Sequence, residues 1–169
     1  QFGNTVRQDT ALIVDATASL KVLTSATLSI AMNESAARLA RVAMYGQGRC
    51  AVVLLEGNGR SSRIDDLTAF LFERCRSETV LRAGVAGDGS DPTRVFVGDN
   101  CRSLTTPMSD ATVSRAAALA GLQLERWLVD GLPADARLCV GVADATGVGM
   151  LWVGAALGPT TALDVVDDG

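Results

Sequence analysis

Short apolar runs, bounded by polar or turn-forming residues, recur along the chain and predict β-strands. The run ALIVD at 11–15 is rich in branched side chains, and the run RCAVVLLE at 49–56 is apolar at nearly every position, as is typical of a strand covered on both faces. The same pattern predicts further strands at 80–85, 94–97, 137–143, 150–157 and 162–166. Turn-rich connections join 80–85 to 94–97 and 137–143 to 150–157, so we expect a hairpin at each place.

Apolar residues spaced three and four positions apart predict three helices, at 34–45, 63–76 and 110–130. The start of each is marked by a side chain that commonly caps helices, namely Asn33, Ser62, and Ser109 or Asp110. The segment 16–32 fits both an alternating and a helical pattern, and we favour a strand.

Two segments repeat the order strand, Asp-Ala-Thr, strand: IVDATASLKVL at 13–23 and GVADATGVGML at 141–151. We interpret both as hairpins in which Asp15 and Asp144 occupy the first turn position, where an aspartate can accept a hydrogen bond from the backbone two residues on. The order of elements predicts a single-domain α+β fold, an antiparallel-rich sheet with about three helices packed on it. We expect this domain to span 1–169, with 1–10 as a flexible N-terminal segment.

Composition and charge bear on whether the chain binds nucleic acid, enters a membrane or is secreted. The chain has 15 basic against 19 acidic residues, and its arginines are scattered between acidic ones, so we expect no nucleic acid partner. No apolar run approaches the roughly 20 residues that span a bilayer, which predicts no membrane insertion. The polar start at 1–10 is unlike a signal peptide and favours a cytoplasmic over a secreted location.

The chain has 4 cysteines and no histidine, which limits both metal and catalytic chemistry. Cys50 and Cys139 lie inside apolar runs, so we expect small buried residues there. Cys75 and Cys101 lie at predicted element ends and are candidates for a disulfide or a reactive thiol. No cysteine pair has zinc-ligand spacing, and no catalytic residue is assigned.

The motif that points most directly to a ligand is Asp15-x-Thr17-x-Ser19, directly after a predicted buried strand. It resembles the Asp-x-Ser-x-Ser metal-ion-dependent adhesion motif of von Willebrand A-type domains, with Thr at the middle position and strand rather than helix after Asp144. The resemblance implies a Mg²⁺ ion held by oxygen ligands. The remaining ligands would come from Thr105 or Thr106 and from Asp144.

The alanine-rich helix at 110–130 and the runs MLWVGAALG and AVVLL carry more apolar surface than a chain of 169 residues easily buries. We therefore expect a non-enzymatic interaction or assembly domain, such as a scaffold, shell or regulatory module, that associates with itself or another protein. Trp127 and Trp152 are candidate interface anchors, and core packing is the alternative for both. Two other classes stay open: a von Willebrand A-like metal-dependent protein-binding domain, and a small-molecule sensor or a carboxylate or thiol enzyme.

Overall fold

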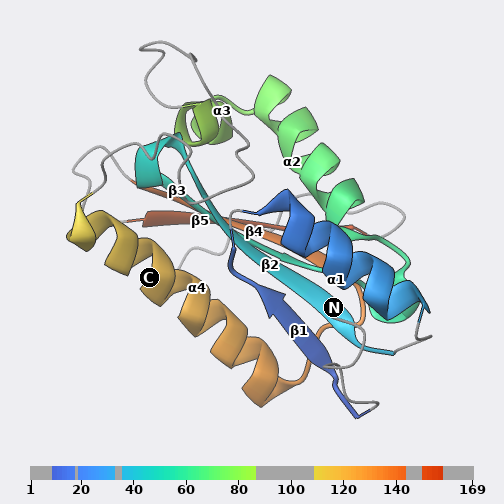
Figure 1. Ribbon diagram of the computed structural model, residues 1–169. Coiled ribbons are helices and arrows are strands. Elements are labelled where there is room, and N and C mark those ends of the chain that lie inside the picture. The colour runs from blue at the N-terminus through green and yellow to red at the C-terminus, as the bar shows by residue number, and fades with distance from the viewer. Residues whose placement is uncertain (1–8, 18, 33–35, 87–108, 144–149, 158–169) are drawn as a thin grey trace.

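In the computed structural model, five strands form one mixed sheet in the order β1-β2-β3-β4-β5 (Figure 1). The residues described are 9–17, 19–32, 36–86, 109–143 and 150–157. The strands are β1 (Leu12–Asp15), β2 (Arg38–Tyr45), β3 (Cys50–Leu55), β4 (Ala136–Ala143) and β5 (Met150–Leu157). β1 pairs with β2 in parallel, and every other neighbouring pair is antiparallel. The chain is thus a single α+β domain with an antiparallel-rich sheet, as predicted.

Four α-helices accompany the sheet in the described part of the chain, where about three were expected. They are α1 (Leu20–Met32), α2 (Ile64–Ser77), α3 (Thr79–Ala86) and α4 (Asp110–Asp130). Two short 3-10 turns, η1 (Gly46–Gly48) and η2 (Asn58–Arg60), flank β3. Figure 1 shows α1, α2 and α3 over one face of the sheet and α4 alone over the other.

Two apolar clusters fill the space between the layers. The larger joins α1, α2 and α3 to the sheet through residues such as Ile30, Leu71 and Leu81. The smaller joins α4 to the opposite face through Ala120 and Trp127. Because both faces of β3 are covered, all six of its residues are buried, which explains why 50–55 is apolar throughout.

Several predicted elements are confirmed. The runs at 11–15, 49–56, 137–143 and 150–157 are strands, and the last two pair antiparallel as expected. The helices predicted at 63–76 and 110–130 are α2 and α4. Ser109 caps α4 by accepting a hydrogen bond from the Thr112 backbone N–H at 3.2 Å.

The strand favoured at 16–32 is wrong, and so is the first hairpin. The segment after β1 forms α1, which carries the chain across the sheet so that β2 can pair in parallel with β1. The Ser19 hydroxyl caps α1 by accepting from the Val22 backbone N–H at 3.3 Å. Ala26 and Ile30, one helical turn apart, then bury the inner side of the helix.

The helix predicted at 34–45 is also wrong, because 38–45 forms β2. Alanines and a three-to-four spacing favoured a helix, but the strand lies between β1 and β3, and its first three residues are buried. Leu39 belongs to the larger core cluster and Ala40 to the smaller one, so successive side chains contact opposite layers as in any strand. Tertiary context here outweighs helix propensity.

The strand predicted at 80–85 is wrong as well, since 79–86 forms α3. The helix turns Leu81 and Gly84 to the sheet, three residues apart, and both are buried. The strands predicted at 94–97 and 162–166 and the flexible segment at 1–10, apart from 9 and 10, lie outside the described residues. In the part of the chain that is described, no helix is both long and apolar enough to cross a bilayer.

Candidate functional site

The loop between β1 and α1 gathers three of the predicted metal-binding residues. Asp15, at the end of β1, is buried, and its Oδ1 accepts hydrogen bonds from the Thr17 backbone N–H at 2.9 Å and the Thr17 hydroxyl at 2.7 Å. Ser19 follows as the cap of α1, and its backbone N–H donates to the Thr17 hydroxyl at 3.4 Å. The predicted bond from Asp15 to the backbone two residues on is therefore present, in a strand-to-helix turn rather than a hairpin.

The second carboxylate oxygen of Asp15, Oδ2, is buried without a hydrogen-bond partner. Its neighbour in the β1–β2 ladder is Arg41, whose Nε is also buried and unpartnered. Leaving a buried polar atom unpaired costs about 1–3 kcal/mol. Among the described residues, this is the only carboxylate oxygen in that state. A cation or a hydrogen-bond donor is the ligand chemistry that would satisfy it.

The sheet register does not bring the end of β4 beside this loop. Asp15 is level with Leu138 through the pairs that join β1, β2, β3 and β4, and Ala143 lies five residues further along β4. The spacing within and between strands puts Ala143 about 16 Å along and about 14 Å across from Asp15. Asp144 and Thr105 themselves lie outside the described residues. No group of three acidic or cysteine side chains suited to a metal occurs within the described ranges.

A second buried carboxylate, Glu56 after β3, is fully partnered. Its Oε2 accepts from the Leu39 backbone N–H and from Arg60 Nε, both at 3.1 Å, and Oε1 accepts from Arg60 Nη2 at 3.3 Å. Arg38 Nε donates to the Glu56 backbone carbonyl at 2.7 Å. Burial lowers the pKa of the Arg38 guanidinium, and the Glu56 carboxylate opposes that shift. This cluster ties β2 to the loop after β3.

The three described cysteines are free thiols and lack the features of activated nucleophiles. Burial raises the pKa of Cys50 to about 12 and that of Cys139 to about 11. Burial, with a smaller contribution from Glu78, also raises the pKa of Cys75. These thiols are therefore protonated at neutral pH, whereas reactive cysteines have a lowered pKa. Cys101 lies outside the described residues.

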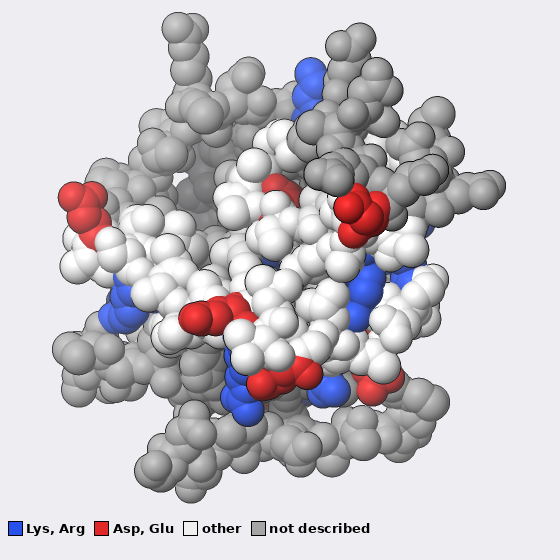
Figure 2. Space-filling model, turned by 90° about the horizontal axis from the view of Figure 1, so that it is seen from below, with Lys and Arg blue, Asp and Glu red and all other residues white. Residues whose placement is uncertain are grey.

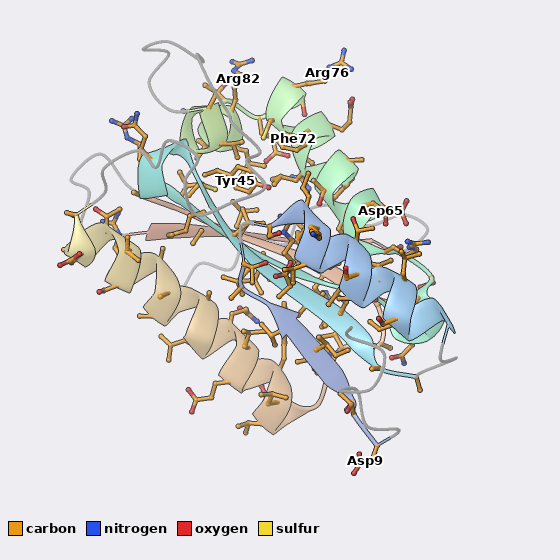
Figure 3. All side chains as sticks on the ribbon, in the orientation of Figure 1. Asp9, Tyr45, Asp65, Phe72, Arg76 and Arg82 are labelled. Atoms are coloured by element: carbon orange, nitrogen blue, oxygen red, sulfur yellow. The ribbon has the colours of Figure 1, made fainter. Side chains whose placement is uncertain are left out.

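An aromatic contact joins α2 to the end of β2. Figure 3 shows Tyr45 on β2 and Phe72 on α2 pointing toward one another, with ring centroids 6.1 Å apart and planes at 88°. Such edge-to-face pairs contribute about 0.5–1.5 kcal/mol beyond their buried area. The Arg76 and Arg82 side chains extend outward from α2 and α3 (Figure 3). We assign this contact a packing role.

The two tryptophans proposed as interface anchors have different surroundings. Trp127 is only 6% exposed and packs with Ala40 and Val53 in the smaller core cluster, which supports core packing over an interface role. Trp152 pairs with Gly141 in the β4–β5 ladder. The structure describes the backbone of β5 and not its side chains, so an interface role for Trp152 stays a prediction.

The outer side of α4 carries apolar residues that the sequence analysis missed. Leu122, Leu128 and Val129 are 61%, 63% and 78% exposed, more than any other large apolar side chain in the described residues. The helix already buries Ala116 and Trp127 against the sheet, so Leu122 and Val129, which lie on the opposite side of the helix, form a second apolar side. The seven-residue separation of Leu122 and Val129 was the signal in the sequence that could have identified it.

The chain is thus a mixed α/β domain with two notable features. Asp15, at the end of β1, has hydrogen-bond partners for only one of its two carboxylate oxygens, and the side of α4 turned away from the sheet carries exposed apolar residues. Comparisons with protein-family models, with curated proteins and with solved structures found no match.

Proposed function

We propose that this chain is a non-enzymatic interaction domain that associates with further copies of itself. The observation that carries this proposal is the exposure of Leu122 and Val129, seven residues apart on the side of α4 turned away from the sheet. Single exposed apolar residues are ordinary, but two large ones on one face of one helix favour an interaction surface. Burying them against a partner would stabilise the complex by about 25 cal/mol for each Å² of apolar area removed from water.

The charge distribution is compatible with such contact. On the face seen in Figure 2, acidic and basic side chains are spread singly among uncharged ones, with no large field of one sign. The net charge of −4 is small, so two copies repel each other weakly at physiological salt. Long-range electrostatics therefore oppose the association of like chains only weakly.

Light-scattering mass on a sizing column, measured over a dilution series with and without millimolar Mg²⁺, tests the proposal. We expect a mass of two or more chains at high concentration that falls toward 17.5 kDa on dilution and does not depend on Mg²⁺. A mass of one chain at every concentration would contradict self-association.

Asp15 supports a second candidate function, a cation-dependent binding domain, because its buried Oδ2 has no partner. In that case Mg²⁺ raises the melting temperature of a monomeric chain, and Asp15→Asn removes the rise while preserving the size of the side chain. If the melting temperature is the same with and without Mg²⁺, the motif from Asp15 to Ser19 serves as the turn and cap described above.

A further inference from the structure

We propose that α4 packs antiparallel against α4 of a second copy, along a seam on its outer side. The seam consists of Ala111, Arg115, Ala118, Leu122, Glu125 and Val129. These positions are separated by four, three, four, three and four residues, the spacing of the contact positions of a two-stranded coiled coil. The inference rests on the proposed self-association and names the surface and the geometry through which it occurs.

The seam is complementary to itself when reversed. With a two-fold axis on the outer side of α4, level with position 120 along the helix, Ala111 faces Val129, Arg115 faces Glu125, and Ala118 faces Leu122. Small residues thus face large ones and the cation faces the anion. A two-fold interface repeats every contact, so the pair of helices contains two of each.

A parallel arrangement of the same seam is disfavoured. A parallel pair of α4 helices in register would place Arg115 opposite Arg115 and Glu125 opposite Glu125. Both of these contacts are repulsive because they join like charges. The charge pattern therefore selects the antiparallel arrangement among pairings of two α4 helices.

Among the described residues, neither of these two charged side chains has an ionic partner. The ion pairs formed among the described residues include Arg126 with Asp130 on the same helix, at 3.7 Å, but neither Arg115 nor Glu125. Arg115 is half-buried, so part of its side chain stays open to solvent. A carboxylate from a second copy would pair with that exposed part and supply the counter-charge that the guanidinium lacks among the described residues.

Gly121, beside the two-fold axis, supports close approach of the two helices. A glycine inside a helix costs about 1 kcal/mol relative to alanine. Gly121 is exposed, and a Cβ added there would meet no atom within 4 Å. Packing among the described residues therefore gives no reason for a glycine at this position, whereas a second backbone crossing near the axis does.

Charge reversal at the seam tests the inference through the dissociation constant from sedimentation equilibrium. Arg115→Glu alone, and Glu125→Arg alone, each turn two attractive contacts into repulsive ones, so we expect dimerisation to weaken about ten-fold or more in each. An equimolar mixture of the two variants restores both contacts in the heterodimer, and the double variant restores them in the homodimer. We expect dissociation constants within about three-fold of the parent chain in both cases.

The mixture also controls for folding, since two unfolded variants could not rescue each other. Arg76→Glu, an equal charge change on α2, is the matched control and should leave dimerisation unchanged. If the parent chain dimerises and the two single variants dimerise equally well, the α4 seam is wrong while self-association stands. If the parent chain is monomeric at every concentration, self-association itself is overturned, and the seam with it.

Discussion

At the scale of single residues, the two buried carboxylates of the sheet are stabilised to different degrees. Glu56 has a guanidinium and a backbone N–H as partners, whereas Asp15 has local partners for one oxygen only. Arg60 reaches Glu56 from a backbone with a φ of 56°, in the left-handed region that is unfavourable for a side-chain-bearing residue. The ion pair therefore stabilises a loop conformation that the backbone alone disfavours.

Removing the partner of Glu56 should destabilise the fold. In Arg60→Ala, the backbone strain is unchanged but the carboxylate is left buried with only the Leu39 N–H, so we expect a loss of about 3 kcal/mol in the free energy of unfolding. Urea denaturation measures this loss. Arg76→Ala is the matched control, because it also removes an arginine paired with a glutamate, Glu73, but both side chains are exposed. Its effect should stay below about 1 kcal/mol, and equal losses in the two variants would contradict the role given to Glu56.

Sequence reasoning located part of the candidate site. It identified Asp15 as a strand-end residue that bonds the backbone of Thr17, because that interaction depends on residues two positions apart. It could not identify the unpaired Oδ2 or the Arg41 neighbour, because the pairing of β1 with β2 joins residues 26 positions apart. The burial of Trp127 could not be predicted from the sequence for a similar reason, because it depends on which face of α4 packs on the sheet.

At the scale of elements, a capping residue together with helical periodicity was reliable for α4 but not at 34–45, where Asn33 and a three-to-four spacing predicted a helix and the chain forms β2. Ser109 and the long apolar stripe gave α4, and the continuous apolar run gave β3. The segments that became α1 and β2 were assigned the wrong way round. At 16–32 a helical spacing of apolar residues was set against an apparent alternation, and the alternation was wrongly favoured; the cap at Ser19 is a local signal for α1 that the sequence analysis did not use.

Two helical glycines should respond in opposite directions to the same substitution. A Cβ at Gly84 on α3 would lie 2.8 Å from a methyl group of Val142 on β4, whereas a Cβ at Gly121 on α4 meets nothing within 4 Å. Gly84→Ala gains helix propensity of about 1 kcal/mol but forces α3 away from the sheet, so we expect a net loss of up to about 2 kcal/mol. Gly121→Ala should stabilise the monomer by about 0.5–1 kcal/mol.

The stabilities of the two glycine variants can be compared by thermal unfolding at a concentration where the chain is monomeric. A gain in stability at Gly84 would mean that α3 does not press against β4 as described. Above the dimerisation range, Gly121→Ala should instead weaken association, because its methyl group occupies the space near the two-fold axis.

At the scale of the whole molecule, the fold depends on pairing that is distant in sequence. β3 pairs with β4 across more than 80 positions, from Leu55 with Arg137 to Cys50 with Val142. The class and the antiparallel character followed from the number and type of elements, but the parallel β1–β2 pair required knowing that α1 crosses the sheet. Burial in the central strands that result raises the pKa of the Cys50 and Cys139 thiols.

That shift predicts a loss of stability at alkaline pH. The folded chain keeps Cys50 and Cys139 protonated up to a pKa of about 12 and about 11, whereas in the unfolded chain a thiol ionises near a pKa of about 8.5. The contribution of the two thiols to the free energy of unfolding is therefore complete below about pH 8.5. It falls as the pH rises toward the folded pKa values, because the unfolded chain then binds fewer protons than the folded chain. Each thiol should lower the free energy of unfolding by about 1.4 kcal/mol per pH unit in this window.

Urea midpoints measured between about pH 8 and 10 give the slope of stability against pH, which separates titration from packing. Cys50→Ala and Cys139→Ala should each make the slope shallower, although both also remove buried atoms. Val53→Ala, in the same strand as Cys50, is the matched control: it creates a cavity of similar kind but removes no titrating group, so it should lower stability equally at every pH. A Cys50→Ala slope as steep as that of the parent chain would mean that water reaches this thiol and that the sheet is less tightly covered by α2 and α3 than the burial of β3 indicates.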